Sequence, residues 1–415
     1  MNNGRFDQII QSNKSGLVTY IMSDSFRIHY NHGLAAAYDL SISTSQQLQI
    51  ILIRTPEENE RNNVFFQQGI TGYQRFLSKF TNDVYYFEKL TDFFFKLLDK
   101  SSTVIKDRAY LSEHRIIEDQ IEEYLSQKNI TFTIVESNVL VPVKVASIKE
   151  EYGARTIRPR IMNKIQDFID IIDFKSPRFF FEQKANDLLH NFIQFKLKNY
   201  DRRNDPSLSV SSELSAYLKY GFISPLEIYE QVHNSGIKNA DLFIEELIVR
   251  RELAYNFVYY NRKYNDFHHM TYGWAYKTME YHVFDTKEYL YTLNDYITFK
   301  THDEYFNTAM KEMVHLGTMH GYMRMYWAKK IIEWSPSFEV AYKNLIYLNN
   351  YYFLDGNNPN GYAGIAWTFG KHDRAWAERP IFGKIRYMNQ AGLKRKFDMD
   401  NYVIKIDKLV QFRQN

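Results

Sequence analysis

The sequence of 415 residues predicts an α/β domain followed by an all-helical domain. In the first 140 residues, short runs of β-branched and aromatic residues alternate with helical patterns. From residue 178 onward the patterns are helical. Strand–helix alternation is typical of a doubly wound, mostly parallel sheet. We therefore expect an α/β domain over residues 1–140, a connector over 141–177 and a helical domain over 178–415.

Five apolar runs in the first domain have the length and composition of buried strands. These runs are LVTYIM (17–22), LQIILIR (48–54), DVYYFEK (83–89), STVIKD (102–107) and ITFTIV (130–135). Helical patterns separate them at residues 32–40, 65–80 and 112–128. The first run is followed by serine and aspartate rather than by a G-x-G-x-x-G turn. We therefore do not expect this domain to bind a dinucleotide through the usual glycine fingerprint.

The chain after Leu140 changes character. The segment VPVKVASIKEEYGARTIRPRI (141–161) contains proline, glycine and many charges without a long period, which indicates a connector. Beyond it, apolar residues recur at helical spacing. The longest such segments are residues 179–197, 242–260, 304–319, 321–334 and 338–353.

The composition excludes several classes of protein. Cysteine is absent, which excludes disulfides, thiolate metal sites and cysteine nucleophiles. The sequence has no apolar run near eighteen residues and no leader peptide, so we expect no membrane span and an intracellular location, cytoplasmic or nuclear. The histidines show no metal-binding spacing and G-x-S-x-G is absent, so we expect neither a metal site nor a serine hydrolase.

The net charge of +3 is small but unevenly distributed. From Lys371 to the C-terminus there are eleven Lys and Arg against five Asp and Glu. Aromatic residues, among them Trp376 and Phe382, lie between these charges. Such a stretch is either a solvated basic face or a surface that binds phosphates and stacks on bases.

Three further patterns could carry chemistry. Trp327 and Trp334 are seven residues apart, so on a helix they share one face about 10 Å apart, a spacing that is typical of a stripe of core residues. Four serines in SVSSELSAYLKYG (209–221) either cap a helix or attract a phosphate. The glutamates of FIEELIVRRELAYNF (243–257) either pair with neighbouring arginines or place a carboxyl group in a cleft.

Taken together, these stretches resemble the DNA photolyase/cryptochrome family, and within it the class II cyclobutane pyrimidine dimer photolyases. The resemblance covers most of the helical domain and is carried by long, distinctive strings. They are YGARTIRPRI (152–161), EELIVRRELAYNF (245–257), KTHDEYFNTAMKEMVHLGTMHGYMRMYWAKKIIEW (300–334) and LDGNNPNGYAGIAWTFGKHDRAWAERPIFGKIRYMNQAGLKRKFD (354–398). The first domain agrees mainly in its α/β pattern.

The resemblance implies a light-driven repair enzyme that acts on UV-damaged DNA. The helical domain would bind FAD, and fully reduced FAD excited by blue light would give an electron to a flipped-out pyrimidine dimer and then regain it. The α/β domain would be of the antenna type, in which some relatives hold a deazaflavin or a folate as a second chromophore. The resemblance also implies a monomer without an obligate protein partner.

The resemblance assigns roles to residues of this chain. Asn349 would face flavin N5, Glu246 would hydrogen-bond a dimer carbonyl, and Met325 and Trp367 would line the lesion cleft. The residues expected near the FAD pyrophosphate are Tyr200, Ser211, Ser212, Leu214 and Ser215. Those expected to contact DNA are Arg374, Trp376, Lys384, Arg386, Lys394 and Arg395.

The resemblance also implies a chain of tryptophans that carries electrons to the flavin. Trp327 and Trp334 match its proximal and distal members, but the middle member is Phe306. Phenylalanine is much harder to oxidise than tryptophan, so we expect intact repair and slow or rerouted photoreduction. Tyr305 and Tyr291 are the candidates for an alternative route.

Three alternatives remain at this point. A cryptochrome-like blue-light receptor would bind FAD without repairing DNA, and a flavin-free nucleic-acid-binding protein could share the fold. A repair enzyme for the (6-4) lesion would need a histidine in the cleft, which the matched strings do not supply. Because Asn349, Glu246, Met325 and Trp367 occur together, the sequence favours repair of cyclobutane dimers.

Overall fold

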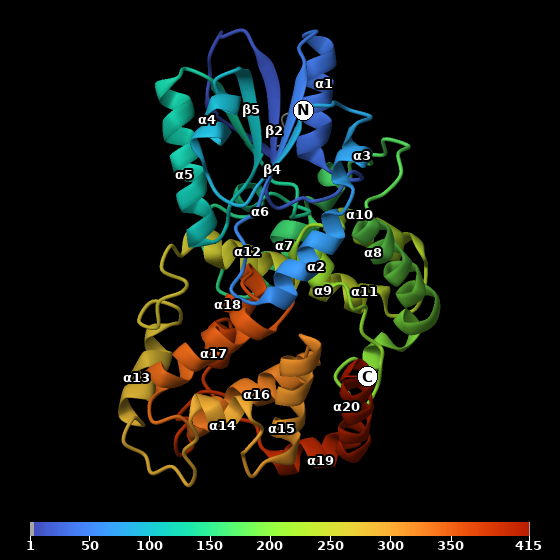
Figure 1. Ribbon diagram of the computed structural model, residues 1–415. Helices are drawn as coiled ribbons and strands as arrows, with labels where there is room; N and C mark the ends of the chain where they lie inside the picture. Colours follow the sequence, from blue (N-terminus) through green and yellow to red (C-terminus); the bar gives the residue numbers. More distant parts are fainter. Residues whose placement is uncertain (1–3, 415) are drawn as a thin grey trace. The chain divides into compact units, whose positions relative to one another are not determined.

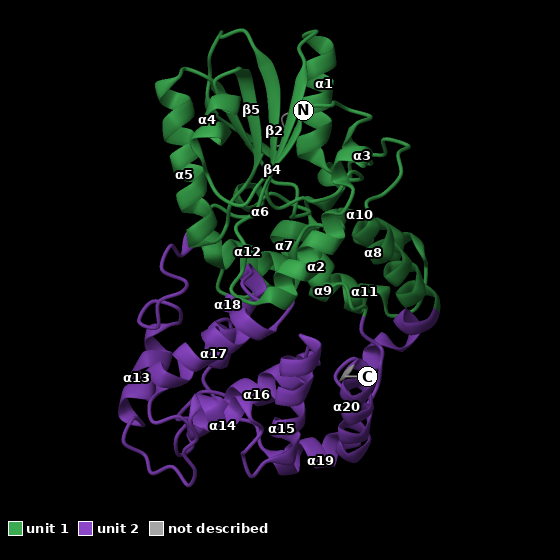
Figure 2. Cartoon of the chain, in the orientation of Figure 1, with its two compact units in different colours: residues 1–194, 212–259 green, residues 195–211, 260–415 purple. Residues whose placement is uncertain are grey.

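The computed structural model describes residues 4–414. They form two compact units, coloured in Figure 2: unit 1 comprises residues 1–194 and 212–259, and unit 2 comprises residues 195–211 and 260–415. Within residues 4–414, no helix combines the length and the apolar character that crossing a bilayer requires. The sequence boundaries at residues 140 and 178 remain predictions, since these units follow packing rather than secondary structure.

Unit 1 contains a six-stranded sheet in the order β1-β6-β5-β2-β3-β4 (Figure 1). The strands are β1 (Phe6–Ile10), β2 (Leu17–Met22), β3 (Leu48–Ile53), β4 (Val84–Phe87), β5 (Ser101–Asp107) and β6 (Thr131–Val135). All neighbouring pairs are parallel except β1 with β6. The five expected strands are present, whereas β1 was not expected because its short run carries polar residues and lies at the sheet edge.

Helices cover both faces of this sheet, as expected of a doubly wound fold (Figure 1). The helices of this part are α1 (His32–Ser43), α2 (Glu60–Ile70), α3 (Tyr73–Leu77), α4 (Asp92–Leu98) and α5 (Ser112–Gln127). Ile21 of β2 packs in one apolar cluster with residues of α4 and α5. Its neighbour Tyr20 points to the opposite face and donates a hydrogen bond to Asn31, the N-cap of α1. The segment expected as one helix over 65–80 is broken at Gly72, whose φ is 75°.

The remaining helices of unit 1 include two in the segment expected to be an irregular connector. These elements are α6 (Val143–Ala146), α7 (Ala154–Met162), α8 (Phe180–Asn191), α9 (Ser215–Lys219), α10 (Pro225–Asn234), α11 (Ala240–Ile244) and α12 (Arg251–Tyr260). The helix α7 forms despite Pro159 because Ala154, Ile157 and Ile161 bury one of its faces. In α7, the burial of this apolar face therefore outweighs the tendency of proline and the charged residues to disfavour a helix.

Buried carboxylates join α8 and α12 to the sheet domain. Glu182 of α8 accepts a hydrogen bond from the backbone N–H of His29 at 2.9 Å. Glu252 of α12 accepts hydrogen bonds from the backbone N–H groups of Leu140 and Val141. Burying a carboxylate is costly unless hydrogen bonds replace its water. These contacts explain why unit 1 extends to residue 259.

Unit 2 is helical. Its helices are α13 (Gly273–Tyr281), α14 (Leu293–Ile297), α15 (Glu304–Lys311), α16 (Gly321–Trp334), α17 (Phe338–Tyr352), α18 (Pro359–Thr368), α19 (Gln390–Lys396) and α20 (Met399–Gln414). The long helix α16 packs against α15, α17 and α18.

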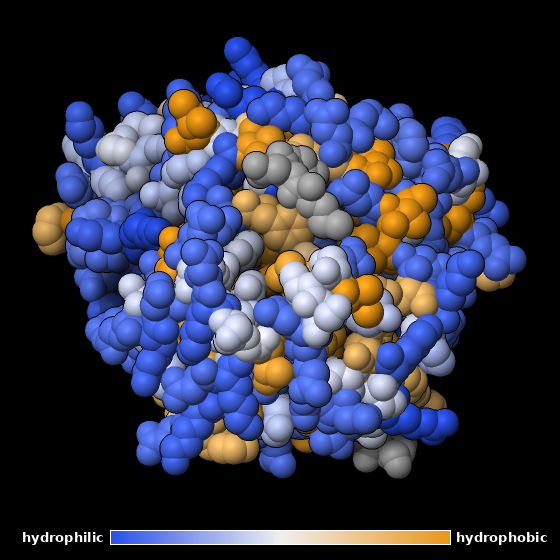
Figure 3. Space-filling view, turned by 90° about the horizontal axis from the view of Figure 1, so that it is seen from above, coloured by the Kyte–Doolittle hydropathy of each residue, from blue (hydrophilic) through white to orange (hydrophobic). Residues whose placement is uncertain are grey.

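On the face of the molecule shown in Figure 3, hydrophilic residues predominate and hydrophobic residues lie between them in separate groups.

Candidate active site

Three mutually packed helices of unit 2 carry five of the predicted site residues, and Trp334 ends the first of them. The helix α16 carries Met325 and Trp327, α17 carries Asn349, and α18 carries Trp367. Each of these helices contacts the other two. Trp327 and Asn349 are buried, whereas Met325 and Trp367 are half-buried. The sequence positions, up to forty-two residues apart, are therefore brought into one packed layer.

The Asn349 side chain is a buried amide held in one orientation. Its Nδ2 donates a hydrogen bond to Asn350 Oδ1 at 2.9 Å, and Asn350 in turn donates to the Tyr362 hydroxyl at 3.0 Å. Gly361 of α18 makes room for the amide, because a Cβ at this position would lie 2.6 Å from Asn349 Nδ2. The orientation of the Asn349 amide thus depends on its hydrogen bonds and on the absence of a side chain at Gly361.

The two tryptophans of α16 are both buried, with 2% of their surface exposed. The Trp334 ring lies 5.1 Å from the ring of Phe306 and 5.4 Å from that of Tyr291. Tyr291 also places its hydroxyl 2.8 Å from His302 Nδ1. Phe306 is therefore directly beside the distal tryptophan, and of the two candidate tyrosines Tyr291 makes the ring contact with Trp334.

A series of cations and indole rings leads from the core to the surface of unit 2. Lys329 Nζ lies 5.7 Å from the Trp367 ring centre, and Arg386 Cζ lies 5.4 Å from the same ring. Arg386 also lies 4.2 Å from the Trp376 ring, and Arg374 lies 5.1 Å from it. Cations over indole faces attract the ring quadrupole, most strongly when water is excluded. Lys329 and Arg386 together thus hold the Trp367 ring in its orientation.

Lys329 is a site residue that the sequence did not indicate. Its side chain is fully buried and donates a hydrogen bond to the carbonyl oxygen of Thr368. Burial disfavours the charged form and lowers the pKa of Lys329 to about 7. The adjacent Lys330 pairs with Glu333 instead. Two consecutive lysines look alike in the sequence, and the helix orientation alone separates their roles.

A two-stranded arm brings together four of the predicted DNA-contacting residues. We call residues 374–386 the basic arm. The backbone N–H of Trp376 donates to the Lys384 carbonyl at 2.8 Å, which sets Arg374 and Trp376 beside Lys384 and Arg386. The other predicted residues lie elsewhere, in the last turn of α19, where positive charge also stabilises the helix. These are Lys394 and Arg395.

In unit 1, Glu246 lies in a π-helical turn between α11 and α12 (Glu245–Arg250). Such turns are frequent at functional sites because they redirect side chains. The neighbouring Glu245 pairs with Arg158 at 2.7 Å and with Arg250 at 3.1 Å. Burial alone would raise the pKa of Glu245, but the two arginines outweigh it and lower the pKa. Glu245 thus pairs with both arginines, and Glu246 remains the candidate acid that the resemblance to the family implies.

The serines before α9 do not cap that helix. Leu214, a buried apolar residue, occupies its N-cap position, and no side chain donates or accepts there. Ser211 and Ser215 are exposed and Ser212 is half-buried. The capping explanation is therefore wrong for α9, and binding of a phosphate group is the alternative that remains. Tyr200 is buried, with Arg203 over its ring at 5.3 Å.

Comparison with known proteins identifies the family. Residues 18–173 match the family model described as DNA photolyase. A deoxyribodipyrimidine photo-lyase from Methanothermobacter thermautotrophicus is 39% identical over an alignment that covers 95% of each chain. The chain belongs to the DNA photolyase family. Another deoxyribodipyrimidine photo-lyase, from Potorous tridactylus, is 36% identical over 73% of this photolyase and 64% of its own length.

Solved structures share the fold of this photolyase at low sequence identity. A class III photolyase from Agrobacterium tumefaciens has a TM-score of 0.71 and 17% identity, and covers 96% of this chain and 88% of its own. A cryptochrome from Synechocystis has a TM-score of 0.71 and 14% identity, and covers 95% and 89%. The expected photolyase fold is thereby confirmed. Because a cryptochrome shares it, the fold does not separate repair from light reception.

The crevice at the carboxyl ends of β2, β3 and β5 is where a doubly wound domain usually binds a ligand. In this photolyase it is filled by its own side chains, with a cavity of about 20 Å³ that has room for one water molecule. Arg54 lies over the rings of Tyr220 at 4.3 Å and Phe66 at 5.2 Å, and its partner Glu57 also pairs with Lys219.

Proposed function

We propose that the chain repairs cyclobutane pyrimidine dimers in DNA under near-UV or blue light. The observation that carries this proposal is the identity of 39% to a deoxyribodipyrimidine photo-lyase along nearly the whole chain. The packed layer of Asn349, Met325 and Trp367 supports it, since an amide between apolar walls suits a flavin and an uncharged lesion. Assignment to class II rests on the resemblance of the sequence strings.

FAD is the proposed cofactor, and a photolyase of the same fold from Sulfolobus tokodaii was solved with two FAD molecules. Fully reduced FAD, excited by light, would supply the electron that opens the cyclobutane ring and regain it afterwards. The uncapped start of α9 and its exposed serines fit a pyrophosphate. The residues proposed to hold FAD are Tyr200, Ser211, Ser212, Leu214, Ser215 and Asn349. A deazaflavin or a folate as a second, antenna chromophore remains a prediction.

The side chains of this protein would bind and orient the reacting groups. The buried amide of Asn349 would hydrogen-bond flavin N5 in a fixed direction. Glu246 would donate a hydrogen bond to a carbonyl of the dimer, which stabilises negative charge as it develops there. Met325 and Trp367 would exclude water and hold the dimer in place. A protein with these tasks needs no metal and no general base, because the cofactor performs the difficult step.

The basic arm would bind the DNA around the lesion. Arg374, Lys384 and Arg386 would neutralise phosphates, and Trp376, 36% exposed, would stack on a base. A damaged base pair is held less firmly in the helix, so extruding it costs less than extruding an intact one. Lys394 and Arg395 would extend the contact. A monomeric state, the lack of an obligate protein partner and an intracellular location remain predictions.

A repair assay tests the proposal. Purified protein is loaded with FAD, reduced, and mixed with an oligonucleotide that carries one thymine dimer. Blue light should restore the thymine absorbance, while a dark control should show no change. A flavin-loaded protein that binds the lesion and restores nothing would instead support the cryptochrome-like receptor. A protein that takes up no flavin would support the flavin-free alternative.

Gly361→Ala should lower repair per absorbed photon without preventing FAD binding. The added Cβ would lie 2.6 Å from Asn349 Nδ2, so the amide must turn away. Misplacing a positioned group by about 1 Å can cost up to about a hundredfold in rate. The quantum yield of repair and the flavin absorption spectrum measure the effect. Gly364→Ala on the same helix is the matched control, because its Cβ would meet open space; equal losses in both variants would contradict the role of Asn349.

A further inference from the structure

The basic arm is a short ribbon that needs external support. Two hydrogen bonds between Arg379 and Gly383 and one between Trp376 and Lys384 join its strands. Ile381 and Gly383 at its turn have positive φ values of 68° and 53°. A two-stranded ribbon of this length is marginally stable in water by itself. The contacts that hold the arm against the rest of unit 2 therefore decide its position.

These contacts converge on the C-terminal end of α13 and the loop that follows. The backbone N–H of Lys384 donates to Thr278 Oγ1 at 3.0 Å, and that of Ile381 donates to Asp285 Oδ2 at 2.6 Å. Gly383 is pressed against α13, because a Cβ there would lie 2.1 Å from Thr278 Oγ1 and 2.7 Å from His282 Cδ2. The arm and the helix end thus meet at His282.

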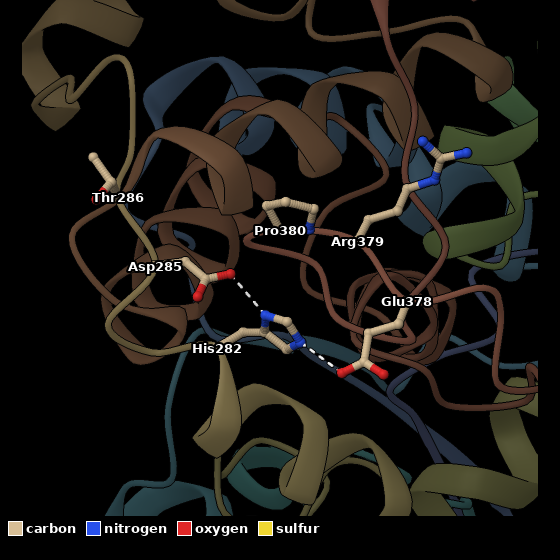
Figure 4. Close-up of a pocket in the computed structure, with 6 residues that line it drawn as sticks. All are labelled: His282, Asp285, Thr286, Glu378, Arg379 and Pro380. Atoms are coloured by element: carbon tan, nitrogen blue, oxygen red, sulfur yellow. Dashed lines mark hydrogen bonds and ion pairs between the residues drawn. The ribbon is translucent and has the colours of Figure 1, made fainter.

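The His282 ring lies between two carboxylates from different segments, as Figure 4 shows. Nδ1 is 2.7 Å from Asp285 Oδ2, and Nε2 is 3.0 Å from Glu378 Oε1. Asp285 belongs to the loop after α13, whereas Glu378 belongs to the basic arm. Both ring nitrogens face acceptors, and only the doubly protonated imidazolium carries two N–H donors. The geometry therefore favours the charged form of the ring.

The charges around His282 favour this form. Burial alone would lower the pKa of His282, but the hydrogen bonds and charges of Asp285 and Glu378 outweigh it and raise the pKa. Arg379 lines the same hollow of about 520 Å³, but its guanidinium lies 4.1 Å from the Tyr387 ring centre. Lys287 lies two residues beyond Asp285, and burial lowers its pKa to about 8. The two carboxylates are thus the groups that decide the charge of the ring.

We infer that doubly protonated His282 is a positioning residue that fixes the basic arm against the end of α13 and so holds the arm in place for damaged DNA. This inference rests on the proposed role of the arm in DNA binding. Because the partners raise the proton affinity of His282, the stabilisation is complete below the ordinary histidine pKa of about 6.5. It is lost as the pH rises through the raised value.

His282→Gln and Glu378→Gln test the inference against His268→Gln, which changes an exposed histidine outside the arm. Two quantities are measured in the dark at about pH 6 and about pH 8.5, which lie below and well above the ordinary histidine pKa of about 6.5. One is hydrogen-exchange protection of residues 378–384, corrected for the intrinsic pH dependence. The other is affinity for an oligonucleotide with a thymine dimer. The flavin spectrum and far-UV circular dichroism verify that each variant is folded.

The unaltered chain and His268→Gln should lose arm protection and DNA affinity severalfold at the higher pH, because His282 loses its second proton as the pH rises through its raised pKa. His282→Gln and Glu378→Gln should show the lower protection and affinity already at about pH 6 and change little with pH. Equal pH dependence in all four proteins would overturn the inference. Arm protection that follows the prediction without any DNA binding would instead refute the proposed role of the arm in DNA binding and leave the role of His282 intact.

Discussion

Phe306→Trp should accelerate the light-driven reduction of oxidised flavin by about tenfold or more. A tenfold change in rate corresponds to a change of about 1.4 kcal/mol in the activation free energy. Phe306 is fully buried, and its ring lies 5.1 Å from that of Trp334. A tryptophan in this place would supply an oxidisable ring beside Trp334, at the position where the resemblance implies that phenylalanine interrupts an electron path toward Trp327. Photoreduction is followed by the loss of oxidised-flavin absorbance under blue light with an external reductant.

Two controls separate this effect from a change in packing. Phe306→Leu keeps the path interrupted and should leave the photoreduction rate near that of the unaltered chain. The larger indole should cost about 1–3 kcal/mol of stability because the site is closely packed. Repair by pre-reduced protein should be the same in both variants. An unchanged photoreduction rate in a folded, flavin-loaded Phe306→Trp protein would refute the interrupted path.

Any residual photoreduction in the unaltered chain should pass through Tyr291. Its ring contacts that of Trp334 at 5.4 Å, and His302 Nδ1 lies 2.8 Å from its hydroxyl, in place to accept the phenol proton. Tyr291→Phe should therefore slow the residual rate further.

Glu246→Ala should lower the quantum yield of repair by up to about a hundredfold to a thousandfold, the range found in rate when one donor to a developing negative charge is removed. The loss should appear in the light-driven step, while the affinity for dimer-containing DNA in the dark should change much less. Single-turnover repair under flash illumination measures the first quantity, and a binding titration measures the second.

Glu245→Ala is the matched control for this residue. It removes a carboxylate of the same size one position away, together with its ion pairs to Arg158 and Arg250. Partly exposed ion pairs contribute little to stability, so the protein should remain folded. Repair should remain close to that of the unaltered chain. A larger loss in Glu245→Ala than in Glu246→Ala would move the catalytic assignment to Glu245.

The sequence predicted the parallel strands and the long helices because both have a period that local composition records. β2 and β3 are nearly continuous apolar runs, as strands covered on both faces must be, while β5 and β6 each hold a short β-branched or aromatic run. β1 escaped prediction because an edge strand of five residues, with Asp7 and Gln8 at its centre, has no such run. α7 was not predicted because Pro159 and the charged residues around it obscure the helical spacing of Ala154, Ile157 and Ile161, which form its buried face.

The candidate site likewise contains residues that the sequence identified and residues that only the structure identified. Trp327, Trp334, Asn349 and Phe306 could be named from strings of sequence, since a resemblance to a family is carried residue by residue. Their roles remain proposals, and the structure supports them by packing α16, α17 and α18 together. The burial of Lys329 beside Trp367 could not be named in advance, because Lys330 next to it has the same chemistry and pairs with Glu333 instead.

What the sequence determined by itself is the family, the order of strands and helices, and the residue types available for chemistry. The tertiary structure decided which of those residues act together. It placed Glu378 against His282 across 96 positions of sequence, packed Arg54 over the ring of Tyr220 in the crevice of the sheet, and paired Glu245 with Arg158 and Arg250. The physical reason is that hydrogen bonds, ion pairs and desolvation depend on distances of a few ångströms, whereas sequence periodicity records only which face of an element is buried.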